Sequence, residues 1–153
     1  MKTMKSVFFG ILTIITMSTT AQVNANKDNV ANNGYDLVNY FTTNTAVRGS
    51  RDFSTLHDGV TYYFTSTDNL TTFKENPEMY LPQFDGYCAF AVAKMNQKVP
   101  VNPETFRIDD GKLYLFFNDY YEGKPFNTII PWLNSEAEME KMAKENWKTL
   151  GSN

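Results

Sequence analysis

The chain of 153 residues contains a single cysteine, Cys88, and a single histidine, His57. Thiolate and thioether sulfurs select soft metal ions such as copper(I), and imidazole nitrogen is a common copper ligand. Cys88, His57 and Met95 are therefore the candidate metal ligands, and copper or another soft metal ion is the candidate cofactor. One cysteine and one histidine exclude an internal disulfide bond, and they exclude a zinc site with four thiolate or imidazole ligands from one chain.

Two other roles for Cys88 stay open. Its neighbours Tyr87, Ala89 and Phe90 are apolar, which favours a small buried core residue, because free cysteine is among the most buried residue types. An unpaired thiol in an exported protein can also be redox-active or form cross-links. Cys–His catalysis needs the imidazole within hydrogen-bond reach of the thiolate, and the order of the two residues matches no hydrolase signature. We assign no catalytic residue, and the sequence favours a non-enzymatic protein.

The first 21 residues are typical of a secretory signal peptide. Lys2 and Lys5 form a short basic region, an apolar run follows from Val7 to Met17, and small polar residues lead to Ala21. As a helix the apolar run would span about 16 Å, which is shorter than a bilayer core of about 30 Å. We therefore expect cleavage after Ala21, or as late as Ala25, no membrane span in the mature protein, and export to the periplasm or the medium.

The mature chain is acidic. Removing Lys2 and Lys5 leaves 12 basic residues against 17 acidic ones, which argues against nucleic-acid binding, because that function needs a basic surface for phosphates. Residues 22–33 are polar and rich in asparagine, so we expect a disordered leader. No internal repeat and no Pro/Gly-rich linker is evident, and residues 34–150 are expected to form one domain.

Two Asp-Gly pairs predict tight hairpins, because glycine and, to a lesser degree, aspartate tolerate positive φ. Asp58-Gly59 separates a strand at 52–56 from one at 60–65, and Asp110-Gly111 separates 105–109 from 112–117. Both sets of alternate residues in 112–117 are largely apolar, so we expect this strand to be buried on both faces.

Helices are predicted after the first hairpin and at the C-terminus. Residues 66–68 offer helix caps, Leu70 and Phe73 form an apolar stripe, and Asn76-Pro77 ends this helix. Ser135 and Glu138 have the spacing of a capping box, and apolar residues recur at helical spacing as far as Leu150. The predicted fold class is α+β: a small antiparallel sheet of hairpins with short helices and a C-terminal amphipathic helix that docks on the sheet.

Four motifs follow one another along the chain: GYDLVNYF at 34–41, GVTYYFTS at 59–66, FKENPEMY at 73–80 and GYCAF at 86–90. In this order they resemble the YHS-domain family, in its exported bacterial branch, over residues 34–118. The resemblance implies a small α+β module similar to metal-trafficking modules found beside heavy-metal pumps, multicopper proteins and oxidoreductases. Paired cysteines bind the metal in those relatives, whereas this chain has Asp36-Leu37-Val38-Asn39 at the first position and keeps only Cys88.

Two functions are consistent with this resemblance. The first is an exported, non-enzymatic YHS-type module that binds a soft metal ion or a small ligand near Cys88. The second is an accessory or protein-interaction module in which Cys88 is structural and no metal is bound.

Overall fold

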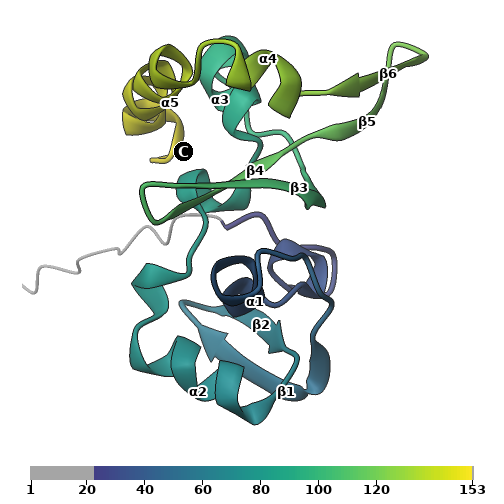
Figure 1. The fold of residues 1–153 in the computed structure, drawn as a ribbon, viewed down its shortest axis with the longest axis vertical. Helices are drawn as coiled ribbons and strands as arrows, with labels where there is room; N and C mark the ends of the chain where they lie inside the picture. The colour runs from purple at the N-terminus through teal and green to yellow at the C-terminus, as the bar shows by residue number, and fades with distance from the viewer. Residues whose placement is uncertain (1–22, 153) are drawn as a thin grey trace, which may run out of the picture.

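The computed structural model describes residues 23–152, so the signal peptide predicted for residues 1–21 lies outside it. The fold is α+β, as predicted, with three separate two-stranded antiparallel sheets. Figure 1 shows two lobes, an N-terminal lobe and a C-terminal lobe. The N-terminal lobe contains α1 (Leu37–Thr42), β1 (Ser50–His57), β2 (Val60–Phe64) and α2 (Thr67–Glu75). The C-terminal lobe contains α3 (Ala89–Met95), β3 (Asn102–Asp109), β4 (Lys112–Phe116), β5 (Asn118–Tyr121), β6 (Lys124–Asn127), α4 (Ile129–Leu133) and α5 (Glu136–Leu150). Three 3₁₀ turns, Asn32–Gly34, Pro77–Met79 and Gln83–Gly86, connect these elements.

Both predicted hairpins form, and both turn at Asp-Gly. Asp58 and Gly59 have φ of 47° and 81°, and Asp110 and Gly111 have φ of 46° and 67°, which are the left-handed conformations that a tight hairpin turn needs. β1 pairs with β2 and β3 pairs with β4, each with one shift of register near the start of its first strand. The third hairpin, β5–β6, was not predicted; it extends away from the rest of the C-terminal lobe (Figure 1).

Strand β4 lies between two hydrophobic clusters. Leu113 and Leu115 pack with residues of α1, β2 and α2, whereas Tyr114 and Phe116 pack with α3, α4 and α5. All four side chains are buried, because successive residues of a strand point to opposite faces. The prediction of a strand buried on both faces is therefore confirmed, and β4 joins the cores of the two lobes.

The predicted helices are present with one local difference. The Ser66 side chain accepts the Asn69 N–H, and α2 ends before Asn76-Pro77 as expected. Ser135 precedes α5, but its side chain makes no capping hydrogen bond; its ψ of 46° lies outside the extended region that an N-cap residue normally adopts. α5 packs chiefly against α3, and the sheet contributes Tyr114 and Phe116 to the same cluster. Within residues 23–152, no helix combines the length and apolar character needed to cross a bilayer.

The expected disordered leader is wrong for residues 23–33. Val30, Ala31 and Asn32 are buried. The Ala31 N–H donates to the Thr61 carbonyl at 2.9 Å, and the Asn24 N–H donates to the Asp85 carbonyl at 2.8 Å. This polar segment is ordered because its backbone groups find partners in both lobes, which composition alone does not reveal.

Candidate functional site

Cys88 lies directly before α3 and is fully buried. Its backbone N–H donates to the Val99 carbonyl at 2.9 Å, which ties the start of α3 to the segment that leads into β3. The preceding residues Phe84, Asp85 and Gly86 all have φ between 51° and 79°. This left-handed turn sends the chain sharply into α3 and directs the thiol towards the end of β4.

The Cys88 thiol is part of a closed ring of hydrogen bonds. The Phe117 N–H donates to Sγ at 3.3 Å, and the Thr128 hydroxyl donates to the Phe117 carbonyl at 2.9 Å. Sγ and Thr128 Oγ1 are 3.3 Å apart. Because a hydroxyl has one hydrogen, and Thr128 gives it to Phe117, the thiol must donate to Thr128. In this ring the thiol makes the hydrogen bonds of a structural cysteine, whereas a nucleophilic cysteine pairs with a base.

A cavity of about 100 Å³ lies beside this ring. Helix α3 and the residue before it contribute Cys88, Phe90, Ala91 and Met95, and the β5–β6 hairpin contributes Tyr121 and Phe126. Val99, Phe117 and Thr128 complete the wall. None of these nine residues carries a charge, and their surface is almost entirely carbon and sulfur.

The three predicted metal ligands do not converge. Cys88 and Met95 line the same cavity, and Met95 is 44% exposed. His57 lies in the N-terminal lobe, where its ring packs on Phe73 and Tyr62. Its Nε2 is 3.6 Å from an Asp58 carboxylate oxygen and 3.9 Å from one of Glu78. Among residues 23–152 there is no group of three or more His, Cys, Asp or Glu side chains placed to hold a metal ion.

The N-terminal lobe has a polar centre at Asp36, which is fully buried. Its Oδ1 accepts the Val38 N–H at 2.9 Å and so caps α1. Its Oδ2 accepts the Thr65 N–H at 2.7 Å, the Thr65 hydroxyl at 2.8 Å and the Asn69 amide at 2.7 Å. The Asn39 amide also donates to Asp36 Oδ2 and to the Thr65 hydroxyl, and the Asn39 side-chain oxygen accepts from the Asn69 amide. Asp36 therefore joins the first two sequence motifs and α2 through one carboxylate.

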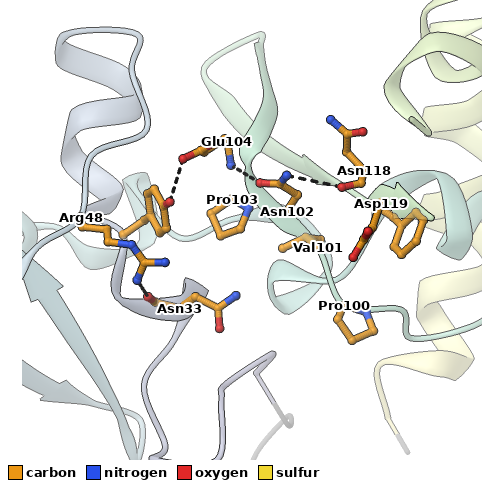
Figure 2. Close-up of a pocket in the computed structure, with 11 residues that line it drawn as sticks. Asn33, Arg48, Pro100, Val101, Asn102, Pro103, Glu104, Asn118 and Asp119 are labelled. Carbon is orange, nitrogen blue, oxygen red and sulfur yellow. Dashed lines mark hydrogen bonds between the residues drawn. The ribbon is translucent and has the colours of Figure 1, made fainter. Parts of the chain in front are cut away.

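A larger, polar cavity of about 380 Å³ lies where the two lobes meet (Figure 2). The Arg48 guanidinium lies over the Tyr35 ring and donates to the Asn33 carbonyl at 3.2 Å. The Tyr35 hydroxyl donates to Glu104 at 2.9 Å, and burial together with this bond raises the pKa of Tyr35. Of these contacts the bond between Tyr35 and Glu104 joins the two lobes, so this part of the cavity wall is also a contact between them.

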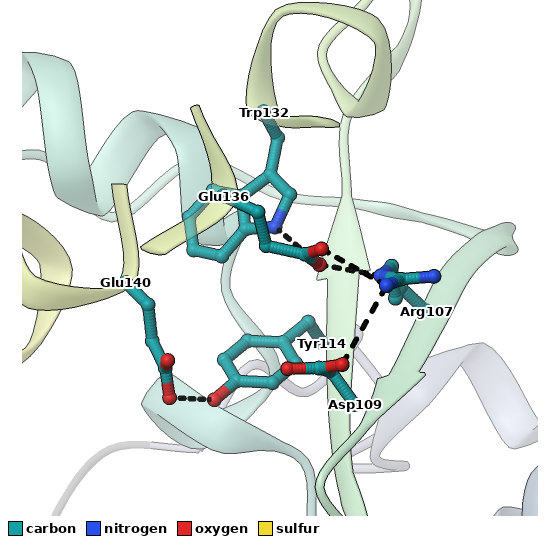
Figure 3. A network of polar contacts seen from close by, with 6 residues as sticks. All are labelled: Arg107, Asp109, Tyr114, Trp132, Glu136 and Glu140. Atoms are coloured by element: carbon teal, nitrogen blue, oxygen red, sulfur yellow. Dashed lines mark hydrogen bonds and ion pairs between the residues drawn. The ribbon is translucent and has the colours of Figure 1, made fainter. Parts of the chain in front are cut away.

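A polar network fastens the β3–β4 hairpin to the C-terminal helices (Figure 3). Arg107 of β3 makes a bidentate ion pair with Glu136 at the start of α5, and the Trp132 indole also donates to Glu136. The Tyr114 hydroxyl donates to Glu140 at 2.6 Å. Lys144 and then Tyr114 hold the pKa of Glu140 below its usual value. These bonds hold the β3–β4 hairpin against α4 and α5, which is a structural role.

Comparisons of the chain with protein-family models, curated proteins and solved structures found no match. The cavity beside Cys88 remains the best candidate site on its geometry. Sequence reasoning found Cys88 and Met95, but it missed Thr128 and Phe126, which come from a hairpin and helix start about 40 residues further along the chain. Nothing in their local sequence marks them as site residues.

Proposed function

We propose that this chain is an exported, non-enzymatic module of the YHS type that holds a small ligand in the cavity beside Cys88. The observation that carries the proposal is the cavity itself: Cys88 of the GYCAF motif and Met95 at the end of α3, the helix that follows Cys88, share its wall. A concave, mostly apolar site with a few polar groups is the usual form of a small-molecule site. The motif order supports the family assignment.

The hydrogen-bonded ring argues against an enzyme that uses Cys88. A nucleophilic cysteine reacts as the thiolate and is activated by an adjacent base. Here the thiol donates to Thr128 and accepts from Phe117, and His57 belongs to the other lobe. We expect a thiol reagent to modify Cys88 in the native protein far more slowly than in the protein unfolded in urea. Equal rates in the two states would contradict this placement of the thiol.

A soft metal ion is the second candidate ligand, because the sulfurs of Cys88 and Met95 face one cavity. Binding copper(I) as a thiolate would require Cys88 to lose the proton that it donates to Thr128. Titration of the exported protein with copper(I), alongside Cys88→Ser and Met95→Leu, tests this candidate. A metal site predicts that both substitutions weaken copper binding, whereas an organic-ligand site predicts weak binding that neither substitution changes.

An accessory, protein-interaction role is favoured by a different feature. Tyr120 and Tyr121 of β5 are 70% and 51% exposed on the projecting hairpin. Exposed aromatic side chains are enriched at protein interfaces. In that role Cys88 is a core residue, and the protein would bind neither copper(I) nor a small ligand at the cavity.

A further inference from the structure

Two segments of the chain have the same backbone structure at a constant separation of 52 residues. In the first, Ser50 pairs with Phe64 and Thr55 with Tyr62; adding 52 to each number gives Asn102–Phe116 and Arg107–Tyr114, which are also paired. The same shift relates every other residue pair of the two hairpins, including the position of the irregularity. We call residues 34–66 the first unit and residues 86–118 the second unit.

The correspondence extends beyond the hairpins. The turn of three left-handed residues before α1, Asn32 to Gly34, matches the turn Phe84 to Gly86 before α3. Asn44 and Asn96 are left-handed after the two helices, with φ of 52° and 51°. The Asp36 N–H donates to the Val47 carbonyl, and the Cys88 N–H donates to the Val99 carbonyl, both at 2.9 Å. No insertion or deletion interrupts the match.

The sequences of the two units retain traces of this relationship. Eight of 33 positions are identical: Gly34/Gly86, Tyr35/Tyr87, Asn44/Asn96, Val47/Val99, Asp58/Asp110, Gly59/Gly111, Tyr62/Tyr114 and Phe64/Phe116. Seven of them fall at left-handed residues, at the bonded valine and at buried positions of the second strand of each hairpin, where geometry restricts the residue type. The eighth, Tyr35/Tyr87, directly follows the left-handed turn of each unit. The chain therefore contains two copies of one structural unit.

This correspondence makes Cys88 the counterpart of Asp36. The Thr65 N–H donates to Asp36, and the Phe117 N–H, 52 residues later, donates to Cys88 Sγ. In the first unit the surrounding space is occupied by a polar cluster in which Asn39, Thr65 and Asn69 all bond to Asp36. In the second unit Ala91 stands at the position of Asn39 and Phe117 at that of Thr65.

The chain after the second unit also takes a different path. In the first unit α2 follows β2 directly and brings Asn69 to Asp36. In the second unit the β5–β6 hairpin intervenes, and Thr128 approaches Cys88 only after it. Tyr121 and Phe126 of that hairpin then line the cavity together with residues of α3. The second unit has no counterpart of the polar cluster and contains the additional hairpin, and these two differences leave an uncharged hollow at this position.

We propose that the cavity beside Cys88 is a binding site for a small, uncharged, apolar ligand, created where the second unit lacks the polar side chains that fill the first. This inference rests on the proposed function and specifies its ligand class. Nothing in the wall compensates a charge, and transferring an unpaired charge into such a site is costly. The volume of about 100 Å³ limits the buried part of the ligand to the size of a single small ring or a short branched chain.

The test uses toluene and benzoate as probes, since they share a ring and differ in charge. Ala91 and Met95 line the cavity and each carries a methyl group, so NMR spectra of labelled methyl groups report binding there. We expect toluene to shift both signals in a saturable manner, and benzoate to bind at least about tenfold more weakly. Absence of a toluene-induced shift at both methyl groups, or equal affinity for benzoate, would overturn the proposal.

The internal repeat supplies a matched pair of variants. Val99→Phe places a large ring in the cavity, whereas Val47→Phe makes the same change at the equivalent, 40% exposed position of the first unit. We expect Val99→Phe to weaken toluene binding at least about tenfold and Val47→Phe to leave it unchanged. If Val99→Phe does not fold, Ala91→Val, which adds two methyl groups inside the cavity, carries the same expectation. Equal toluene affinity in wild type and the folded cavity variant contradicts the proposed location.

The outcomes separate this inference from the proposed function. Copper(I) binding that depends on Cys88 and Met95, without toluene binding, leaves a ligand site beside Cys88 but refutes the apolar ligand class. If neither toluene nor copper(I) binds, the ligand class and the proposed function are refuted together. Toluene binding that is lost in Val99→Phe supports both.

Discussion

Replacing Asp36 with alanine should destabilise the protein strongly, because Asp36 is a buried acceptor for several donors. The backbone N–H groups of Val38 and Thr65 donate to its carboxylate at 2.9 and 2.7 Å and cannot turn towards another acceptor. Leaving a buried donor without a partner costs about 1–3 kcal/mol. Because Thr65 is only half-buried, we take the lower part of the range and expect a loss of about 2–4 kcal/mol in the free energy of unfolding.

The measurement is urea unfolding followed by circular dichroism, with the slope of the transition compared between variants. For a folded region of this size a loss of 1 kcal/mol corresponds to a fall of about 3–5 °C in the melting temperature, so Asp36→Ala should melt about 10 °C lower. Asp36→Asn should lose most of the same stability, because an amide nitrogen cannot accept the donors that Oδ2 accepts.

The matched control is Asp52→Ala, which removes an exposed aspartate from β1 of the same lobe. We expect this change to alter the free energy of unfolding by no more than about 0.5 kcal/mol. If Asp36→Ala were as mild as Asp52→Ala, the reasoning from unpaired donors would be refuted, and Asp36 would not organise the N-terminal lobe.

Three further predictions concern pH and the N-terminus. Burial raises the pKa of Asp85, and its Oδ2 has no hydrogen-bond partner within residues 23–152. A protein loses stability as pH rises through the raised folded-state pKa of such an acid, so Asp85→Asn should raise the melting temperature at pH 7 and not at pH 3. Lys144 and then Tyr114 lower the pKa of Glu140, so its carboxylate stabilises the folded protein above the unfolded-state pKa of 4.5, and this stability is lost as pH falls below that value. Glu140→Gln should therefore show a smaller acid-induced fall in melting temperature than wild type, and an identical fall would contradict this role of Glu140. Asn24 bonds to the carbonyls of Asp85 and Gly86, so a chain beginning at Gln22 should have a higher melting temperature than a chain beginning at Asn26, and equal melting temperatures would contradict a stabilising role for these bonds.

Local features of the chain were predicted well because they depend on residues close in sequence. The Asp-Gly turns, the cap of α2 at Ser66 and the end of that helix before Pro77 follow from the backbone preferences of a few residues. The capping box at Ser135 was predicted on the same basis, yet it does not form. There Glu136 bonds to Trp132 and also to Arg107, which lies 29 residues away in the sequence. The contact with Arg107 is tertiary, and a local pattern does not include it.

By itself the sequence determined the α+β class, both Asp-Gly hairpins and the presence of Cys88 and Met95 as candidate ligands. Only the tertiary structure decided that His57 lies in a different lobe from Cys88, and that Thr128 is a hydrogen-bond partner of the thiol. The internal repeat was also visible only in three dimensions. Eight identities in 33 positions are too few to stand out in a sequence, whereas backbone hydrogen bonds keep the same register because the turn, bulge and helix geometry tolerate most side-chain changes.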